Sequence, residues 1–562
     1  MTPPDVDWRK EEVPLFSREN SRSGHGVGNV ARELDTRPPL APERSAATSD
    51  GANFRSVLTL SSESGDSAEA SEAPASFVDL NLDQIVASIT AGKQEYNLAP
   101  FFHRPLKSVE AIKYRQDVMR DLENRSLFDA VTEFANAIRS VRDDLTQVEK
   151  LHYKYQKEAW ALDAIDLYCQ AVRQLLAGFC LSRPQSAGLV AFVAYLEAYT
   201  ASPTFQLLLE DIAALRAKLA SIRYKLLIGN GVIIVSAYSD EPDYGAEIQA
   251  DFGKFRQGAA ADHVFKFKVF AQMNHIEAGV LDRVARLYPD TFAELDAFIA
   301  RSANFFDPTI QRFDREVQFY MAYVAYMRSI GGAGLPFSYP AVSPTSKEIR
   351  ASECYDLALA RILADKRLPI VTNDFYLDGR ERIVIVSGPN QGGKTTFART
   401  FGQLHYLASI GCPVAAAEAR LFLFDQLFTH FEKEEDIHNL RGKLHYDLYR
   451  LHNTLAATTS QSIIILNEIF NSTSLNDAVF LSAKVLTRII ALDAICVCVT
   501  FIDELAALSK TAVSMASNVK PDNVAERTFK VVRRPPDGLA YAISVAEKYR
   551  LTYKQLRERL QS

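Results

Sequence analysis

Apolar residues recur at helical spacing from residue 77 to about residue 329, which predicts that this part of the chain is mostly α-helical. A hairpin signal interrupts the helices, because apolar residues 222–228 and 232–238 flank Gly229-Asn230-Gly231. Residues 264–270 alternate apolar and basic side chains, as a half-buried strand does. We therefore expect a helical domain over residues 76–330 that carries a small β insertion at about 222–270.

The pattern changes after this domain. Glycines and prolines over residues 331–347 predict a linker. From residue 348 to 562, apolar strands alternate with helices, which predicts an α/β domain with a mostly parallel sheet covered on both faces. Residues 1–75 are rich in Ser, Pro, Ala, Gly, Arg and Glu and bury too few apolar groups to fold, so we expect a disordered tail there.

Composition narrows the possible environments. The 562 residues are enough for about three domains, and the net charge of −6 requires any DNA-contacting surface to be a local basic patch. Cys496 and Cys498 alternate within an apolar strand and fit small buried hydrophobes in a reducing compartment. No apolar stretch approaches the ~18 residues of a membrane span. We expect a soluble, cytoplasmic protein with no membrane association.

One loop carries the main chemical signal. It follows the apolar run Ile383-Val384-Ile385-Val386 and precedes a segment with helical spacing, which is the context of a phosphate-binding loop. Lys394 would reach the β- and γ-phosphates of a nucleotide, and the Thr395 hydroxyl would bind Mg²⁺. The predicted nucleotide-binding residues are Gly388, Pro389, Asn390, Gln391, Gly392, Gly393, Lys394, Thr395 and Thr396.

The form of this loop, Gly-Pro-Asn-x-Gly-Gly-Lys-Thr-Thr, resembles that of the MutS family of mismatch-repair ATPases, which are relatives of the ABC ATPases. Further elements of that family follow in order: Ile410-Gly411-Cys412-Pro413-Val414-Ala415, Phe424-Asp425-Gln426-Leu427-Phe428-Thr429, Ser462 to Glu468, Ser472-Thr473-Ser474-Leu475-Asn476-Asp477 and Val499 to Leu505. Asn373 matches the Asn before the family's first strand. Pro105-Leu106, followed by Ile112, Arg115 and Val118, resembles the entry to the family's lever helices.

The resemblance implies an ATPase that uses ATP and Mg²⁺, with Lys394 and Glu468 as its catalytic residues. Glu468 would polarise the attacking water, while Thr395 and the residue before Glu468 would hold the metal. That residue is Asn467, where the family has Asp. Asn lacks the formal charge, so either the Mg²⁺ site is weakened or the change is simply tolerated.

Other positions also depart from the family. Phe501 replaces a His that senses the γ-phosphate, and Ile370 replaces an aromatic that stacks on adenine. Gly442 and Lys443 stand where the family has the Ser-Thr pair that reaches the partner's nucleotide; Lys443 is either such a contact or a solvated loop residue. Near the C-terminus, Gly538 and Tyr541 resemble the family's "G-x-x-x-SYG" element, although Ala542 replaces its last glycine.

Mismatch-reading members of the family insert the Phe of a Phe-x-Glu motif into the base stack. No such motif precedes the lever entry, and we assign Phe292, in Phe292-Ala293-Glu294, to core packing within a helix. We therefore expect the chain to lack the mismatch-reading domain.

The resemblance favours an ATP-dependent DNA clamp of the MutS type, related to mismatch repair, that dimerises through its ATPase domains and binds DNA without mismatch specificity. Two alternatives remain open. One is a nucleotide-gated dimerising scaffold with little hydrolysis, and the other is a MutS-like ATPase that acts on a protein partner without DNA.

Overall fold

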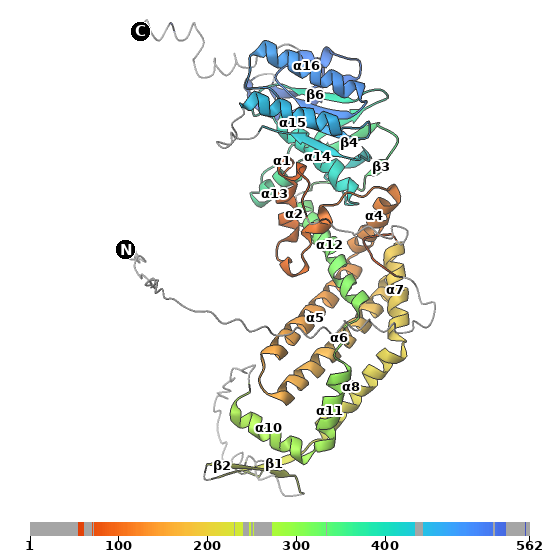
Figure 1. The fold of residues 1–562 in the computed structure, drawn as a ribbon, viewed down its shortest axis with the longest axis vertical. Helices are drawn as coiled ribbons and strands as arrows, with labels where there is room; N and C mark the ends of the chain where they lie inside the picture. Colours follow the sequence, from red (N-terminus) through yellow and green to blue (C-terminus); the bar gives the residue numbers. More distant parts are fainter. Residues whose placement is uncertain are drawn as a thin grey trace, which may run out of the picture. The chain divides into compact units, whose positions relative to one another are not determined.

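The computed structural model describes residues 54–60, 70, 72–229, 231–239, 247–248, 251, 273–332, 334–432, 442–520, 523–535 and 557. The chain is largely helical and contains mixed sheets, which confirms in outline the predicted helical region and α/β domain (Figure 1). The first part of the chain contains α1 (Ser76–Asp79), α2 (Leu82–Thr90), η1 (Gln94–Tyr96), α3 (Ala99–Phe102), α4 (Val109–Glu123), α5 (Arg125–Lys150), α6 (Lys154–Ser182), α7 (Ala187–Thr200), α8 (Pro203–Ser221), β1 (Tyr224–Gly229), β2 (Val232–Ala237), α10 (His275–Leu287), α11 (Pro289–Arg301) and α12 (Pro308–Gly331).

Helix α12 is the centre of this part. It is apolar around much of its circumference, and Phe313, Val317 and Tyr320 are fully buried. Asp307 caps its first turn by accepting hydrogen bonds from two backbone N–H groups. The Tyr323 hydroxyl donates to the Pro413 carbonyl at 2.6 Å, so α12 also contacts the part of the chain that contains the sheets.

The predicted hairpin forms, with β1 and β2 paired antiparallel up to Gly229 opposite Val232. The predicted strand over residues 264–270 lies outside the described residues. Phe292 is buried in α11, and its ring lies 4.7 Å from that of Tyr155 in an edge-to-face contact. Core packing therefore explains Phe292. Within the described residues, no helix is long and apolar enough to cross a membrane.

The remaining elements build two sheets and the helices around them. They are β3 (Ala341–Ser343), β4 (Ile349–Cys354), α13 (Leu357–Asp365), β5 (Asn373–Leu377), β6 (Ile383–Ser387), α14 (Lys394–Ser409), β7 (Glu418–Phe422), β8 (Leu427–His430), α15 (Lys443–Ala457), β9 (Ile463–Asn467), α16 (Leu475–Ala491), β10 (Ile495–Val499), η2 (Asp503–Ala507), β11 (Ala512–Lys520) and β12 (Asn523–Arg533).

The larger sheet has the order β12-β11-β6-β10-β9-β8, with all neighbours parallel except β12, and the smaller has the order β3-β7-β4-β5. Alternate residues of the central strands enter two different cores. Cys496 and Cys498 face the core that includes residues of α15 and α16, and α14 packs into the other core. Val499 pairs with Val386 of β6 and with Asn467 of β9, so the carboxyl ends of these strands meet at one edge. That edge positions the candidate site.

Two predicted boundaries are wrong. Residues 54–60, which we name the strap, were expected to be disordered but are packed against the helices, with Val57 and Leu58 buried. The predicted linker 331–347 contains β3, which pairs with β7 in the smaller sheet. In both cases a short segment gains its structure from residues distant in sequence, and local composition does not record such pairing.

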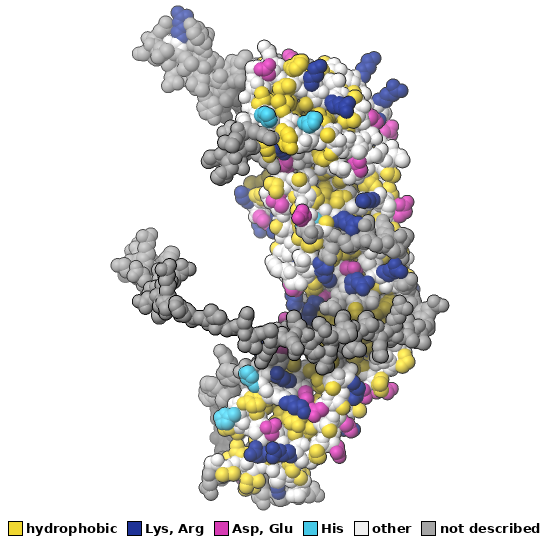
Figure 2. Space-filling model, in the orientation of Figure 1, with side chains coloured by type: hydrophobic (Ala, Val, Ile, Leu, Met, Phe, Trp, Pro, Cys, Tyr) yellow, Lys and Arg dark blue, Asp and Glu magenta, His cyan; other side chains and the backbone are white. Residues whose placement is uncertain are grey.

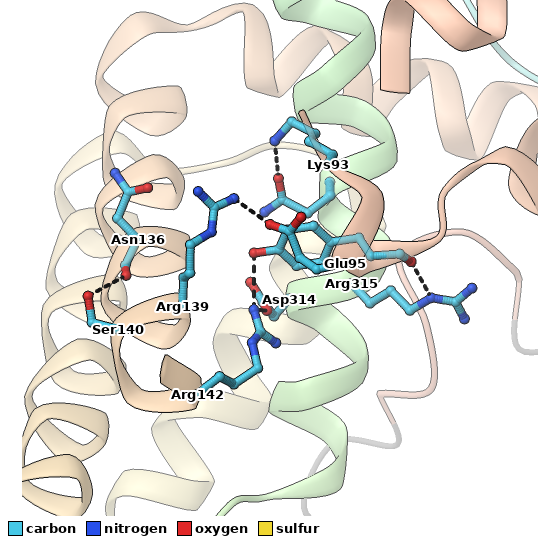
Figure 3. A network of polar contacts seen from close by, with 10 residues as sticks. Lys93, Glu95, Asn136, Arg139, Ser140, Arg142, Asp314 and Arg315 are labelled. Atoms are coloured by element: carbon cyan, nitrogen blue, oxygen red, sulfur yellow. Dashed lines mark hydrogen bonds and ion pairs between the residues drawn. The ribbon is translucent and has the colours of Figure 1, made fainter. Parts of the chain in front are cut away.

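A polar network fastens residues 93–97 to α5 and α12 (Figure 3). Arg142 pairs with the buried carboxylate of Asp314 at 2.7 Å, and Arg139 pairs with Glu95 at 2.6 Å. Lys93 donates to Gln318 on α12. Burial raises the pKa of Asp314 to about 6, against the opposing effect of Arg142. The network joins three separate segments around one buried acid.

Candidate functional site

The glycine loop connects β6 to α14, as its sequence context predicts. Gly388 and Gly393 have φ angles of 118° and 91°, which side chains other than glycine rarely adopt. A Cβ at Gly388 would lie 2.5 Å from Ser517 Oγ of β11, and one at Gly392 would lie 2.4 Å from the same atom. Close approach of β11 therefore requires glycine at both positions.

Lys394 is the first residue of α14, and its side chain is only 4% exposed. Its Nζ donates to the Gly388 carbonyl at 2.9 Å and to the Pro389 carbonyl at 3.3 Å, with Asn390 Oδ1 at 3.4 Å. Burial lowers the pKa of Lys394, and the nearby Glu468 carboxylate opposes that shift. The ammonium group of Lys394 is thus buried and bonded to uncharged oxygens of the loop.

Thr395 and Asn467 meet where α14 begins and β9 ends. The Thr395 hydroxyl donates to Asn467 Oδ1 at 3.0 Å. These are the two protein oxygens predicted to face Mg²⁺, and the structure brings them together from positions that are 72 residues apart.

Glu468 follows β9 directly and adopts a φ of 54°, an uncommon value for a residue other than glycine. Its N–H donates to the Val499 carbonyl at 2.9 Å, which fixes the turn against β10. One carboxylate oxygen lies 3.9 Å from Lys394 Nζ. Burial raises the pKa of Glu468, Lys394 lowers it, and the like charge of Glu432 raises it further.

Phe501 lies beyond the end of β10, where the resembling family has His. Lys394 Nζ is 4.3 Å from the centre of its ring, a cation–π distance. Phe501 is 53% exposed, whereas the Lys394 side chain that it contacts is only 4% exposed. The structure therefore places Phe501 at the site, where it contributes a π face and no hydrogen-bond donor.

A second acidic group at this edge, Glu432, was missed by sequence reasoning. It follows β8, pairs with Lys443 at the start of α15, and accepts from Asn471 Nδ2 at 2.8 Å. Its bond to Lys443 lowers the pKa of Glu432. Lys443 is thus held by a carboxylate of its own chain, so the reading of Lys443 as a purely solvated side chain is wrong. One signal in the sequence could have identified Glu432, which is an acidic residue a few positions after the strand-like segment 424–429.

Two adjoining cavities open at the loop. One, of about 250 Å³, is lined by residues 390–396 with Leu359, Glu468 and Phe529. The other, of about 430 Å³, is mostly apolar and shares Leu359, Gly393, Thr396 and Phe529 with the first. Side chains that line only the second cavity include Tyr355, Leu363, Pro369, Ile370 and Phe397.

Asn373 holds the wall of these cavities in place. Its Oδ1 accepts from the Val531 N–H at 2.7 Å, and its Nδ2 donates to the Phe529 carbonyl at 3.2 Å. Phe529 has a φ of 59°, and its side chain lines both cavities, so Asn373 supports an unusual bend in β12. Gly538, Tyr541 and Ala542 lie outside the described residues.

A glycine loop between a parallel strand and a helix, with Lys, Thr, Asn and Glu converging at the strand ends, is typical of nucleotide-binding domains. Residues 384–555 match the family model described as MutS domain V. This segment of the chain is therefore similar to the MutS domain of that description.

Curated relatives match the chain over part of its length. The DNA mismatch repair protein MutS of Thermotoga maritima is 31% identical over 140 residues, which cover 25% of this chain and 18% of that protein. The protein of the same name from Shouchella clausii is 35% identical over 124 residues, which are 22% of this chain and 14% of that protein. The chain therefore spans less than a fifth of the length of these relatives.

Proposed function

We propose that the chain binds ATP with Mg²⁺ in the two adjoining cavities and hydrolyses it slowly, in a cycle coupled to DNA association as a homodimeric clamp. One observation carries the proposal: Lys394, Thr395, Asn467 and Glu468 converge at one sheet edge, inside the segment that matches MutS domain V.

The residues of the smaller cavity fit the phosphates of a nucleotide. The start of α14 offers backbone N–H groups and the positive end of a helix dipole, and Lys394 adds a buried cation. In the structure, Lys394 Nζ donates hydrogen bonds to carbonyl oxygens of the loop. In the nucleotide complex, phosphate oxygens would take their place. The adjoining apolar cavity fits the base, with aliphatic packing from Ile370 in place of aromatic stacking.

Thr395 and Asn467 fit a hard cation, because both offer oxygen atoms at one place. Within the described residues, no group of three or more His, Cys, Asp or Glu side chains is arranged to hold a metal ion. The metal would therefore depend on these two oxygens, the phosphates and water. When bound, Mg²⁺ supplies charge neutralisation as the phosphoryl group transfers.

The protein groups nearest this chemistry favour slow turnover. Glu468 would orient the attacking water, since its carboxylate lies beside Lys394 at the end of β9. Asn467 brings no negative charge, and Phe501 presents a ring where a donor would stabilise the developing charge. Glu468 can therefore still orient the attacking water, but the negative charge replaced by Asn467 and the hydrogen-bond donor replaced by Phe501 are missing.

DNA association would use a limited surface. Basic and acidic side chains are interspersed on the face of the helical part that Figure 2 shows, and the net charge is −6. We therefore expect few phosphate contacts and a shallow dependence of affinity on salt.

The decisive measurement is steady-state ATP turnover with and without duplex or branched DNA, using Glu468→Gln as the matched inactive control. Stimulation by DNA supports the clamp. Turnover that DNA does not change supports an ATPase that acts on a protein partner. ATP binding with turnover no greater than that of the control supports a nucleotide-gated scaffold.

A further inference from the structure

The strap, residues 54–60, lies in a groove formed by α4, α7 and α12. Its anchors are apolar: Phe54 lies 4.9 Å from the ring of Phe192 on α7, and Val57 and Leu58 are 0% and 1% exposed. Arg55 is the one exposed residue of the strap. A seven-residue segment is thus buried along most of its length.

Side chains of the groove bind the backbone of the strap. Four consecutive carbonyls each accept a hydrogen bond: Arg55 from Arg312 at 2.7 Å, Ser56 from Tyr114 at 2.7 Å, Val57 from Tyr320 at 2.6 Å and Leu58 from Arg115 at 2.9 Å. Glu316 Oε2 accepts from the Val57 N–H at 3.0 Å. The strap belongs to neither of the two larger sheets nor to the hairpin.

The hydrogen bonds of the Ser56 side chain require a serine at this position of the strap. Its hydroxyl donates to Glu316 Oε2 at 2.9 Å and accepts from the N–H groups of Leu58 and Thr59, which closes a tight turn. The turn directs Val57 and Leu58 into the groove. The pattern that the groove recognises is therefore aromatic-x-Ser-aliphatic-aliphatic.

The groove has the character of a binding site that needs a ligand. Glu316 and Tyr320 are buried, and the strap supplies hydrogen-bond partners to both. Buried Arg115 also donates to the strap, in addition to its bond to the Ile410 carbonyl. Burying such groups without partners is costly, on the order of 1–3 kcal/mol each. Main-chain hydrogen bonds combined with buried side chains of the bound segment are typical of peptide recognition.

We propose that the groove between α4, α7 and α12 is a peptide-recognition site and that the strap is its ligand, bound in cis and exchangeable with the same segment supplied in trans. Its ligand class is an extended peptide of the pattern aromatic-x-Ser-aliphatic-aliphatic, and a second copy of this chain carries one. This proposal is independent of nucleotide and DNA binding.

The first test uses the full chain and a fluorescein-labelled peptide of residues 53–61, NFRSVLTLS. Val57→Asp with Leu58→Asp places two carboxylates at buried positions beside Glu316 and should eject the strap from the groove. This variant should bind the peptide, as followed by anisotropy, at least tenfold more tightly than the wild type. Arg55→Asp is the matched control, because that side chain is exposed, and it should behave like the wild type.

A serine-to-alanine peptide, NFRAVLTLS, should bind at least tenfold more weakly because the turn and one bond to Glu316 are lost. A folded double variant that does not bind NFRSVLTLS would overturn the proposal, since the strap would then be a fixed part of the fold.

Hydrogen exchange on the wild-type protein decides the question if the double variant does not fold. An exchangeable strap opens locally, so the Val57 and Leu58 amides should exchange at least tenfold faster than the buried amides of α12. Exchange of both sets at one common rate would mean that the strap leaves only on global unfolding, and the proposal would be wrong.

Discussion

Lys394 is the residue on which the proposed nucleotide binding depends most directly. It is the buried cation at the base of the smaller cavity, and its present partners are neutral loop oxygens and the ring of Phe501. Lys394→Ala should weaken ATP affinity at least 100-fold in an equilibrium binding assay, because it deletes the charge that faces the β- and γ-phosphates. Lys510→Ala removes an exposed lysine outside the cavity and should leave affinity unchanged. Near-wild-type affinity of Lys394→Ala would refute the phosphate-loop assignment.

Substitution of Asn467 by Asp measures how much a single negative charge contributes to Mg²⁺ binding and turnover. Asp is nearly isosteric with Asn and would still accept the hydrogen bond that Thr395 donates at 3.0 Å. Asn467→Asp should therefore lower the Mg²⁺ concentration for half-maximal turnover about threefold or more and raise the rate. Asn453→Asp adds the same charge at an exposed position of α15 and serves as the control.

An unchanged Mg²⁺ dependence in Asn467→Asp would mean that the substitution in this chain is merely tolerated. A reduced rate would mean that the Asn amide donates a hydrogen bond on which the site relies, and that the charge argument has the wrong sign.

At the scale of elements, the sequence predicts those helices, strands and turns whose formation depends on neighbouring residues. The order of strand, glycine loop and helix around Lys394 follows from β-branched residues, glycines and helical spacing, and the hairpin around Gly229 follows from its turn residues. The strap and β3 could not be predicted in this way. The bond from Val57 to Glu316 joins residues 259 positions apart, so nothing in the neighbourhood of Val57 signals it.

The same limit applies within the site. The sequence identifies Phe501 as a departure from the family. The contact of its ring with Lys394 depends on how close the segment after β10 lies to the start of α14. Glu432 and Lys443 are 11 residues apart, and residues 433–441 between them lie outside the described part of the chain. The pairing of Glu432 with Lys443 depends on the position of β8 beside β9 in the sheet, since Glu432 follows β8. It also depends on the position of the first residue of α15, which is Lys443.

Glu316 makes the stability of the helical part depend on pH. Burial raises its pKa from 4.5 to about 7, although the bonds from Ser56 and Val57 lower it. An acid with a raised pKa contributes stability that is present below pH 4.5 and is lost as the pH rises through 7. At ~1.4 kcal/mol per pKa unit, this loss is on the order of 3 kcal/mol.

Glu316→Gln removes that titration. Both hydrogen bonds from the strap go to one carboxylate oxygen, so the Gln carbonyl can still accept them. Between pH 4.5 and pH 8, the free energy of unfolding of the variant should therefore rise relative to the wild type by about 2–3 kcal/mol. Urea unfolding followed by circular dichroism measures this difference. Glu110→Gln, which changes an exposed carboxylate of α4, should show no such trend.

At the scale of the whole molecule, α14 connects the nucleotide loop to the helical part. It begins at Lys394 and ends at Ser409, a length of about 24 Å at 1.5 Å per residue. At its far end, Arg115 of α4 donates to the Ile410 carbonyl at 3.1 Å and also holds the Leu58 carbonyl of the strap. Arg115 therefore connects the C-terminal end of α14 with α4 and the strap.

Glu468→Gln should separate nucleotide binding from turnover. Gln keeps the size of the side chain but cannot polarise water as the carboxylate does, so ATP affinity should stay within about threefold of the wild type while turnover falls at least 50-fold. If two ATPase domains share the nucleotide, as we propose, the variant should accumulate as a dimer in ATP and remain monomeric in ADP. Size-exclusion chromatography with light scattering measures this, and undiminished turnover would assign the water-orienting role to another residue.

Recognition of DNA is the property for which the sequence makes the sharpest negative prediction. No Phe-x-Glu motif precedes the lever entry, and Phe292, in the Phe-x-Glu of α11, is 5% exposed and packed against Tyr155. It cannot enter a base stack without leaving the core.

If the chain binds DNA, its affinity for a mismatched duplex should therefore lie within tenfold, or ~1.4 kcal/mol, of that for a matched duplex at the same salt concentration. Phe292→Ala provides the control, because it should lower the thermal midpoint by removing a core aromatic while leaving the ratio of the two affinities unchanged. A mismatch preference above tenfold that disappears in this variant would show that Phe292 leaves the core to read the mispair. A preference that persists would place the mismatch reader on another residue of this chain.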